Sequence, residues 1–249
     1  MSEVRPAVLQ ENRDGLKLLT LDRPATSNAL SAAIVEELLR HVRESAHDGT
    51  HTLVFRSNGP NFCAGFDLSA LEEARDADLL ARFVRVELLL QAVYMAEFDT
   101  VACAKGAAYG AGADLFAACR YRLADPSARF AMPGLQFGLA LGTRRFAALV
   151  GEAAAYEVLA SGAAYDAVRA VELGLASRIE KEDAWSALIQ ARHEARPVLG
   201  EALARLTRLT RRDTRAEDMY ALVESASEPG LVERVRRYRE RALSRKTRK

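Results

Sequence analysis

The chain has 249 residues, 49% of them hydrophobic, which is enough for one sizeable core with a smaller appendage. Its formal net charge of +1 gives no electrostatic footprint for nucleic acid or for a membrane surface. No apolar run reaches the roughly 20 residues that a membrane span needs, and residues 1–6 lack the apolar segment of a secretion signal. We therefore expect a cytoplasmic protein.

The first elements in chain order are a β-hairpin, a helix and a strand. Apolar runs at 4–10 and 16–21 flank Asp14-Gly15, a dipeptide typical of hairpin turns. Ser31 is predicted as a helix N-cap, because apolar residues follow it at helical spacing. These residues are Ile34, Val35, Leu38, Leu39 and Val42. Residues 53–55 read as a short buried strand.

The middle of the chain alternates helices with strands. A helix over 78–96 precedes a strand at 101–104, and a further helix covers 110–119. Later elements are strands at 121–124, 129–131 and 176–179, with helices at 143–150, 152–160 and 166–173. This alternation predicts right-handed βαβ units, and therefore an α/β fold with parallel strands.

After about residue 182 only helical patterns remain. They cover 182–195, 198–210, 214–227 and 230–244. The last two carry the apolar residues Met219, Leu222, Val223, Leu231, Val232, Val235 and Tyr238. Either an intramolecular helical layer or contacts with other subunits would bury these side chains. We place a core domain at 1–190 and a C-terminal helical region at 191–249.

The three cysteines, Cys63, Cys103 and Cys119, are odd in number and lack metal-ligand spacing. They are predicted to be reduced and mostly buried. The histidines are His41, His47, His51 and His193. All four lie away from the motif loops described next, so we expect them at the surface and assign no metal site.

Two segments rich in glycine and alanine carry the strongest functional signal. Residues 61–68, NFCAGFDL, follow one apolar strand, and residues 105–114, KGAAYGAGAD, follow another and open a helix. Such loops leave backbone N–H groups unobstructed, and an N–H at a helix N-terminus favours negative charge. Two loops of this kind facing each other would polarise a carbonyl. For either loop alone, we would favour glycines that serve only tight turns and close packing.

Five segments in order resemble the crotonase superfamily, the enoyl-CoA hydratase/isomerase family. They are residues 21–31, 61–68, 105–115, 128–133 with Gly138, and 167–176. The resemblance covers most of the chain and implies a crotonase-like spiral of ββα turns with a C-terminal helical oligomerisation region. It also implies an acyl-CoA substrate and a homo-trimer or hexamer. Coenzyme A would arrive as part of the substrate, so no separate cofactor is expected.

The resemblance places an oxyanion hole at the backbone N–H groups of Phe66 and Ala111. The family usually has glycine where Ala111 stands, but alanine supplies the same N–H. Asp114, three residues further on, shares a helix face with Ala111. Hydratases commonly carry a catalytic glutamate there, so Asp114 is implied as the general acid/base. The alternative is an aspartate that only stabilises the helix N-terminus.

The clearest departure from the family pattern is Gly134, which follows Pro133 where two-carboxylate hydratases carry glutamate. Hydration needs one group to activate water and another to deliver a proton. A single carboxylate suits movement of a double bond, decarboxylation or thioester hydrolysis better. Gln136 could orient water but cannot carry a proton. A CoA-thioester-binding protein without turnover would show the same residues.

Coenzyme binding is implied along the loops 22–28 and 64–69. The residues assigned to it are Arg23, Ala25, Ala64, Gly65, Phe66, Asp67, Leu68, Gly110 and Ala111. Arg23 is either a phosphate partner or an ordinary surface arginine, and Tyr109 either donates a hydrogen bond or packs. Arg144 and Arg145 would pair with an acidic acyl substituent or face solvent, and we expect solvent. Helix 78–96 is expected to border the acyl pocket.

The C-terminus is strongly basic. Its cationic residues are Arg234, Arg236, Arg237, Arg239, Arg241, Arg245, Lys246, Arg248 and Lys249. In the family a basic residue near the C-terminus often contacts the 3′-phosphate of the coenzyme, whereas a charge run by itself usually marks a solvated helix face. RNA binding by this tail is the least favoured alternative, and it would require a steep salt dependence.

Overall fold

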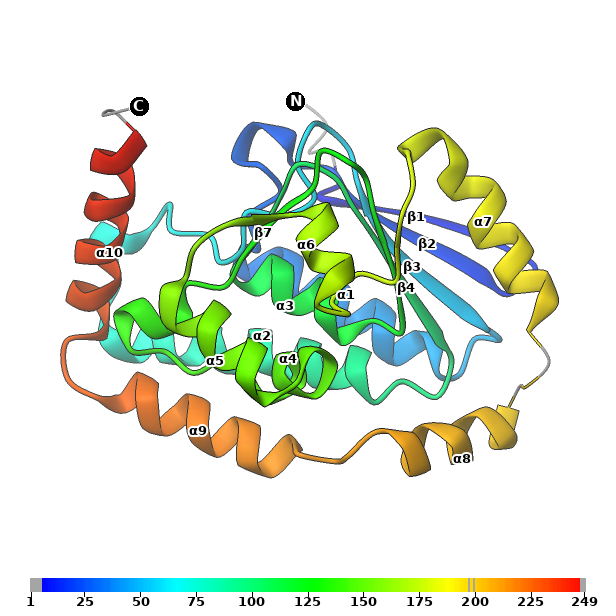
Figure 1. Ribbon diagram of the computed structural model, residues 1–249. Helices are drawn as coiled ribbons and strands as arrows, with labels where there is room; N and C mark the ends of the chain where they lie inside the picture. Colours follow the sequence, from blue (N-terminus) through cyan, green and yellow to red (C-terminus); the bar gives the residue numbers. More distant parts are fainter. Residues whose placement is uncertain (1–5, 197, 199, 247–249) are drawn as a thin grey trace, which may run out of the picture.

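The computed structural model describes residues 6–196, 198 and 200–246 (Figure 1). Its N-terminal hairpin pairs β1 (Val8–Arg13) with β2 (Leu16–Leu21), and Arg13 lies opposite Leu16. Both turn residues, Asp14 and Gly15, have positive φ angles of 47° and 80°, the backbone conformation that an Asp-Gly hairpin turn favours. The predicted hairpin is confirmed over residues 8–21. The predictions for residues 1–5, which include the start of the first apolar run, fall outside the residues that the structure describes.

The main sheet has six strands in the order β1-β2-β3-β4-β6-β9, and every pair after the hairpin is parallel. Its later strands are β3 (Thr52–Ser57), β4 (Asp99–Ala104), β6 (Tyr121–Ala124) and β9 (Arg178–Ile179). A second sheet joins β5 (Ala107–Tyr109), β7 (Arg129–Ala131) and β8 (Tyr165–Asp166). The parallel pairs confirm the βαβ prediction. The sequence analysis did not predict β5 and β8, which have only three and two residues.

Three helices cover one face of the main sheet. They are α1 (Ala32–Ser45), α2 (Asp76–Tyr94) and α3 (Ala111–Ala118). The Ser31 side chain accepts a hydrogen bond from the Ile34 N–H and caps α1 as predicted. All five predicted apolar positions of α1 are buried in the main core cluster. Shorter helices α4 (Thr143–Val150), α5 (Glu152–Ser161) and α6 (Ala167–Glu172) follow.

The C-terminal helices surround this core (Figure 1). Helix α7 (Glu182–Ala195) packs Trp185 and Ile189 onto the other face of the sheet. Helices α8 (Gly200–Thr210) and α9 (Arg215–Ser227) then run along the bottom of the molecule in Figure 1, and α10 (Leu231–Lys246) stands at its left edge. Within the chain, most of the apolar residues predicted on α9 and α10 pack against α2 and the loop before it. The domain boundary placed at residue 190 falls inside α7 and stays a prediction.

The prediction that all four histidines lie at the surface is wrong for two of them. His47 and His51 are exposed, but His41 and His193 are buried. Both lie on the inward faces of their helices, and the His193 ring is 2.9 Å from the Thr52 hydroxyl. Burial is the main cause that lowers the pKa of both imidazoles, so they are neutral structural groups.

All three cysteines are free and buried, as predicted. Burial raises the pKa of Cys63 and Cys119 to about 12, so neither supplies a thiolate near neutral pH. No helix in the described part of the chain is long and apolar enough to cross a membrane.

Candidate active site

The two motif loops lie side by side, joined by backbone hydrogen bonds. The Cys63 N–H donates to the Ala107 carbonyl at 3.0 Å, and the Tyr109 N–H donates to the Cys63 carbonyl at 2.9 Å. On its other side the first loop pairs with the segment before α1, where the Leu30 N–H donates to the Gly65 carbonyl at 2.7 Å. Residues 61–68 are therefore held from both sides, like a short strand.

Two glycines allow this close approach. A Cβ on Gly65 would lie 2.5 Å from the Tyr109 carbonyl oxygen and 3.3 Å from the Ala111 nitrogen. Gly65 also has a φ of 91°, which L side chains rarely adopt. A Cβ on Gly112 would collide with the carbonyl oxygen of Cys63. The glycines thus do serve close packing, and that packing brings the Phe66 and Ala111 backbones to one place.

The N–H groups of Phe66 and Ala111 are both unused. Within the described residues neither donates a hydrogen bond, although the neighbouring Asp67 N–H reaches the Leu30 carbonyl and the Gly110 N–H reaches the Ala131 carbonyl. Ala111 is the first residue of α3, so the partial positive charge of the helix N-terminus adds to its N–H. Such a pair of donors suits an oxygen that gains negative charge.

Both donor residues line a cavity of about 160 Å³. Most of its remaining lining is apolar: Ala64, Leu68, Phe83, Met132, Pro133, Leu135, Phe137, Leu139, Leu141, Leu159 and Val235. Phe83 belongs to α2, which confirms that the helix predicted over 78–96 borders the pocket. Its ring stacks on Phe66 with centroids 4.1 Å apart. The polar side chains on the lining are Tyr109, Asp114, Thr143 and Tyr238.

Asp114 is the one carboxylate on this lining among the residues that the structure describes. It is 5% exposed, and its Oδ1 atom is buried without a hydrogen-bond partner in the described chain. Gly142 packs so closely against the carboxyl group that a Cβ there would overlap Oδ1. Burial raises the pKa of Asp114 well above its usual range; the Arg145 charge opposes this effect and the Glu87 charge reinforces it.

Gly134 also lines the cavity, at the start of the short helix η3 (Gly134–Phe137). A Cβ there would lie 2.8 Å from the carbonyl oxygen of Leu139, so any side chain requires the neighbouring turn to move. The hypothesis that Gln136 orients water in this cavity fails. Its side-chain amide donates to the Ser161 carbonyl at 2.7 Å and is not part of the lining.

Comparison with known proteins identifies the family. The family described as enoyl-CoA hydratase/isomerase matches residues 11–233. The chain belongs to the enoyl-CoA hydratase/isomerase family. A solved structure of a Bordetella parapertussis protein assigned to these hydratase/isomerases shares 43% identity, with a TM-score of 0.91 over 93% of this chain and 98% of that one. The crotonase-like fold and the broad enzyme class expected from the sequence are thereby confirmed.

Curated relatives agree with this assignment at lower identity. A Mycobacterium bovis protein assigned as an enoyl-CoA hydratase is 34% identical over 177 residues, covering 69% of this chain and 71% of its own. The enoyl-CoA isomerase/hydratase of Mycosarcoma maydis is 29% identical over 178 residues, covering 66% of this chain and 65% of its own. Hydratase and isomerase names both occur among the relatives, so membership of the family does not choose the reaction.

Outside the cavity lining, Arg23 forms an ion pair with Asp67 of the first motif loop at 3.1 Å. Burial opposes ionisation of Asp67, but hydrogen bonds from Ser69 and then from Arg23 outweigh it and hold the pKa of this carboxyl below its usual value. Asp67 therefore serves the loop internally. The Arg23 side chain is one-third exposed, which leaves part of it open to a ligand.

Asn28 joins the segment 22–28 to the segment 58–61, a role that the sequence did not reveal. Its side-chain oxygen accepts from the Arg23 N–H at 2.8 Å, and its amide donates to the Asn58 and Asn61 carbonyls at 2.9 and 2.8 Å. Asn28 is fully buried with a φ of 55°. A buried asparagine in this left-handed conformation is a recognisable signal only once the backbone is known.

The prediction that Arg144 and Arg145 face solvent is wrong for Arg145, which is 3% exposed. Its guanidinium donates to both carboxylate oxygens of Glu87, at 2.9 and 2.6 Å, and to Asp218 at 3.1 Å. Neither arginine lines the cavity. The helical phase of α4 turns Arg145 inward together with the buried Phe146, while Arg144 remains half exposed.

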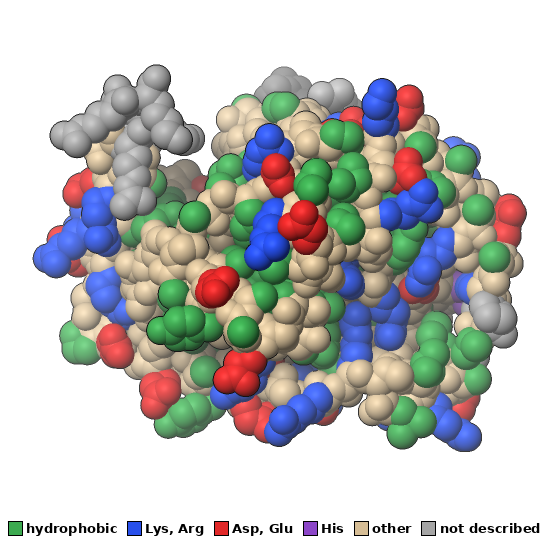
Figure 2. All heavy atoms as spheres, in the orientation of Figure 1, with side chains coloured by type: hydrophobic (Ala, Val, Ile, Leu, Met, Phe, Trp, Pro, Cys, Tyr) green, Lys and Arg blue, Asp and Glu red, His purple; other side chains and the backbone are tan. Residues whose placement is uncertain are grey.

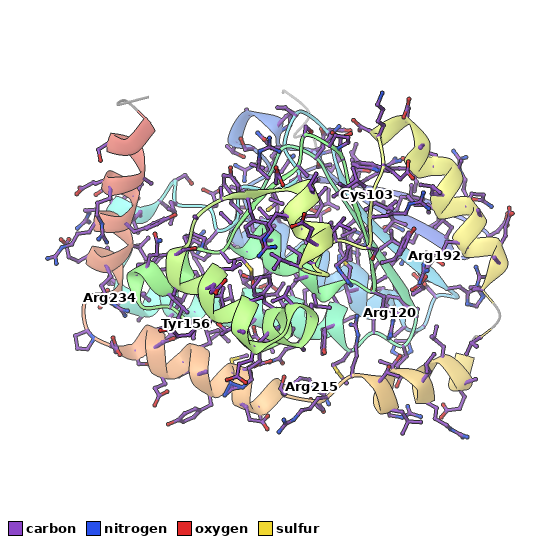
Figure 3. The ribbon with its side chains drawn as sticks, in the orientation of Figure 1. Cys103, Arg120, Tyr156, Arg192, Arg215 and Arg234 are labelled. Atoms are coloured by element: carbon purple, nitrogen blue, oxygen red, sulfur yellow. The ribbon has the colours of Figure 1, made fainter. Side chains whose placement is uncertain are left out.

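Helix α10 closes one side of the site with Val235 and Tyr238. Arg234, labelled in Figure 3, holds this helix in place by donating to the Phe137 and Gly138 carbonyls, both at 3.0 Å. Of the other basic residues near the C-terminus, Arg236 and Arg239 pair with Glu72, and Arg237 pairs with Glu233. Arg248 and Lys249 lie outside the described residues.

Proposed function

We propose that this protein is an acyl-CoA thioester enzyme of the enoyl-CoA hydratase/isomerase type. The N–H groups of Phe66 and Ala111 bind the thioester oxygen, and Asp114 moves a proton on the acyl chain. One observation carries the proposal: two unused backbone donors share a small apolar cavity with a single buried carboxylate. Coenzyme A enters as part of the substrate, so we propose no separate cofactor.

The two N–H groups would stabilise the thioester enolate. Removal of a proton beside the carbonyl shifts negative charge onto its oxygen, and each donor aimed at that oxygen contributes about 3–4 kcal/mol to the transition state. The burial that raises the pKa of Asp114 makes its ionised form a stronger base and its protonated form a stable carrier of the proton. Asp114 can thus take a proton from one carbon and return it to another.

Among the reactions of the family, this arrangement best supports a double-bond isomerase. Isomerisation removes and returns one proton, so a single carboxylate completes it. Hydration needs a second group for water, and neither Gly134 nor Gln136 supplies one on the described lining. Efficient hydration is therefore the less favoured reaction.

The absence of a cation on the described lining argues against acyl groups that carry a second carboxylate. Arg145 is bound by Glu87 and Asp218, and Arg144 also lies off the cavity. A malonyl-type acyl group would therefore bury an unpaired charge, which is costly. Decarboxylation is accordingly disfavoured. Thioester hydrolysis and acyl-CoA binding without turnover remain the alternatives that activity measurements must decide.

We propose that the coenzyme runs along the loops 22–28 and 64–69, with Arg23 at a phosphate. We also propose a homo-trimer, or two trimers paired as a hexamer. Helices α8 and α9 carry the exposed apolar side chains Leu206, Leu209, Tyr220 and Val223, and Figure 2 shows hydrophobic side chains gathered over α8. Contacts between subunits would cover this surface. Light scattering of the purified protein tests the oligomer.

Product analysis tests the reaction. The purified protein is incubated with trans-2-enoyl, 3-enoyl and malonyl-type CoA thioesters, and products are separated chromatographically and weighed by mass spectrometry. We expect 3-enoyl and 2-enoyl thioesters to interconvert without a change of mass. A water adduct as the main product would contradict the isomerase assignment, and release of CO2 or of free CoA would favour decarboxylation or hydrolysis. Binding with no product from any thioester would favour a non-catalytic binder.

A further inference from the structure

A buried network of charges lies beside the acyl cavity and joins three helices. Arg145 on α4 binds Glu87 on α2 through two hydrogen bonds and Asp218 on α9 through a third. The side chains of Arg145 and Glu87 are 3% and 1% exposed. Further donors complete the network, because Gln91 donates to Glu87 at 2.9 Å and Thr214 donates to Asp218 at 2.8 Å. Buried charges persist only when they are satisfied in this way.

The network is connected to the site through the first turn of α4. Gly142 is the N-cap of this helix, and it is the residue that packs against the Asp114 carboxyl group. Thr143 lines the cavity, and Arg145 follows two residues later in the same turn. The ion pairs of Arg145 with Glu87 and Asp218, called the clamp below, therefore also hold the turn at Gly142, which limits where the Asp114 side chain can lie.

The charges of the network act on Asp114 in opposite directions. Arg145 favours the ionised carboxylate, and Glu87 favours the neutral acid. Tyr109 and Tyr238 line the same cavity as Asp114. Tyr165 on β8 is a further titratable neighbour: its hydroxyl is buried without a hydrogen-bond partner in the described chain, and burial together with the Asp114 charge raises its pKa. Of the two carboxylates that bind Arg145, Glu87 is the one that raises the pKa of Asp114.

We propose that Arg145 is a positioning residue for Asp114. Because Glu87 and Asp218 bind its guanidinium, Arg145 holds the turn at Gly142 against the Asp114 carboxyl group. It also supplies the positive charge that keeps proton exchange possible inside an apolar cavity. This inference rests on the proposed role of Asp114. Glu87 has two effects on Asp114. It fixes the position of Arg145, and its negative charge opposes the effect of the Arg145 charge on the Asp114 carboxyl group.

The two carboxylates of the clamp provide a matched pair of variants. Glu87→Gln and Asp218→Asn each remove one negative partner of Arg145 with almost no change of shape. Glu87→Gln also removes the negative charge that raises the pKa of Asp114. A purely structural clamp would respond alike to both changes, whereas electrostatic control of Asp114 would respond to Glu87→Gln alone.

The test measures kcat/KM against pH for the wild type and both variants. In Glu87→Gln the acid limb should move to lower pH, because the ionised Asp114 carboxylate loses a repelling neighbour. Activity on that limb, relative to the plateau, should rise roughly threefold or more. In Asp218→Asn the limb should stay in place, although thermal stability should fall in both variants because each loses an ion pair of Arg145. Equal shifts, or no shift in Glu87→Gln, would overturn the inference.

A second readout does not depend on activity. The infrared band of the protonated Asp114 carboxyl group, assigned by its loss in Asp114→Asn, is titrated in the same proteins. The pH at which this band is half lost should move to lower pH in Glu87→Gln and should not move in Asp218→Asn. If Asp114→Asn retains full activity, while the Asp114 band of the wild type still moves to lower pH on Glu87→Gln, then the proposed function fails and the coupling stands. An Asp114 band that ignores Glu87→Gln would reject the coupling itself.

Discussion

The cavity has a backbone part and a side-chain part, and they are built in different ways. The backbone part is the pair of N–H groups of Phe66 and Ala111, which we propose as the oxyanion hole and which hydrogen bonds on both sides of their loops hold in place. The side-chain part is Asp114, the proposed acid/base, together with Gly134, at the two positions where the two-carboxylate hydratases that the sequence resembles carry glutamate. A backbone donor tolerates a change of its own side chain, as at Ala111, provided that the glycines that let the two loops approach are kept, whereas a side-chain group loses its chemistry with one substitution.

The largest expected effect on activity comes from a change in the side-chain part of the site. Asp114→Asn keeps the shape of the residue but removes its ability to exchange a proton. We expect kcat to fall about 10²–10⁴-fold, while acyl-CoA affinity, which depends on the loops, changes little. Steady-state kinetics and calorimetric titration with a substrate analogue measure the two quantities separately. Unchanged kcat would remove Asp114 from the mechanism.

The next largest effect on activity is expected from a change that disturbs the backbone part of the site. Gly65→Ala places a methyl group 2.5 Å from the Tyr109 carbonyl oxygen, so the two loops must separate and the paired donors must lose alignment. We expect kcat/KM to fall about 10²-fold or more, as for the loss of one oxyanion donor. Gly49→Ala is the matched control, since Gly49 has a similar φ of 82° but nothing within 4 Å of its Cβ position. Equal losses in the two variants would point to backbone strain rather than to the loop contact.

A smaller effect is expected from restoring the missing glutamate. Gly134→Glu should not create an efficient hydratase, because its Cβ would press on the Leu139 carbonyl oxygen at 2.8 Å and displace the turn. We expect a loss of stability of about 1–3 kcal/mol, measured by urea denaturation, with no gain in water addition to 2-enoyl thioesters. Gly134→Ala separates the cost of the Cβ from that of the carboxylate. A large gain in hydration would show that only the carboxylate was missing.

The smallest effect should follow the change of Ala111 to the residue usual in the family. Ala111→Gly leaves the backbone N–H in place, so kcat/KM should stay within about twofold, which is small beside the loss of one oxyanion donor. Stability should fall by at most about 0.5–1 kcal/mol, because glycine loses more conformational freedom in a helix. Kinetics and thermal denaturation test this together. A large loss of activity would mean that the alanine methyl group shapes the cavity.

Local patterns predicted most of the fold. The Asp14-Gly15 turn, the Ser31 cap and the helical spacing of the α1 residues each depend on neighbours within a few positions in the chain, and all three are confirmed. It was harder to predict burial that depends on which face of a helix turns toward the rest of the protein. His41, His193 and Arg145 were expected at the surface and are buried, because their helices turn these residues inward.

For the site, the sequence by itself determined the two glycine-rich loops, the carboxylate at Asp114 and the absence of one at Gly134, since these are matters of residue type and spacing. Only the tertiary structure decided what surrounds them. Val235 and Tyr238 come from α10, more than a hundred residues after Asp114, and Arg145 meets Glu87 across 58 positions. Such partners are chosen by packing between helices and by the need to satisfy buried charge, and neither leaves a local pattern in the chain.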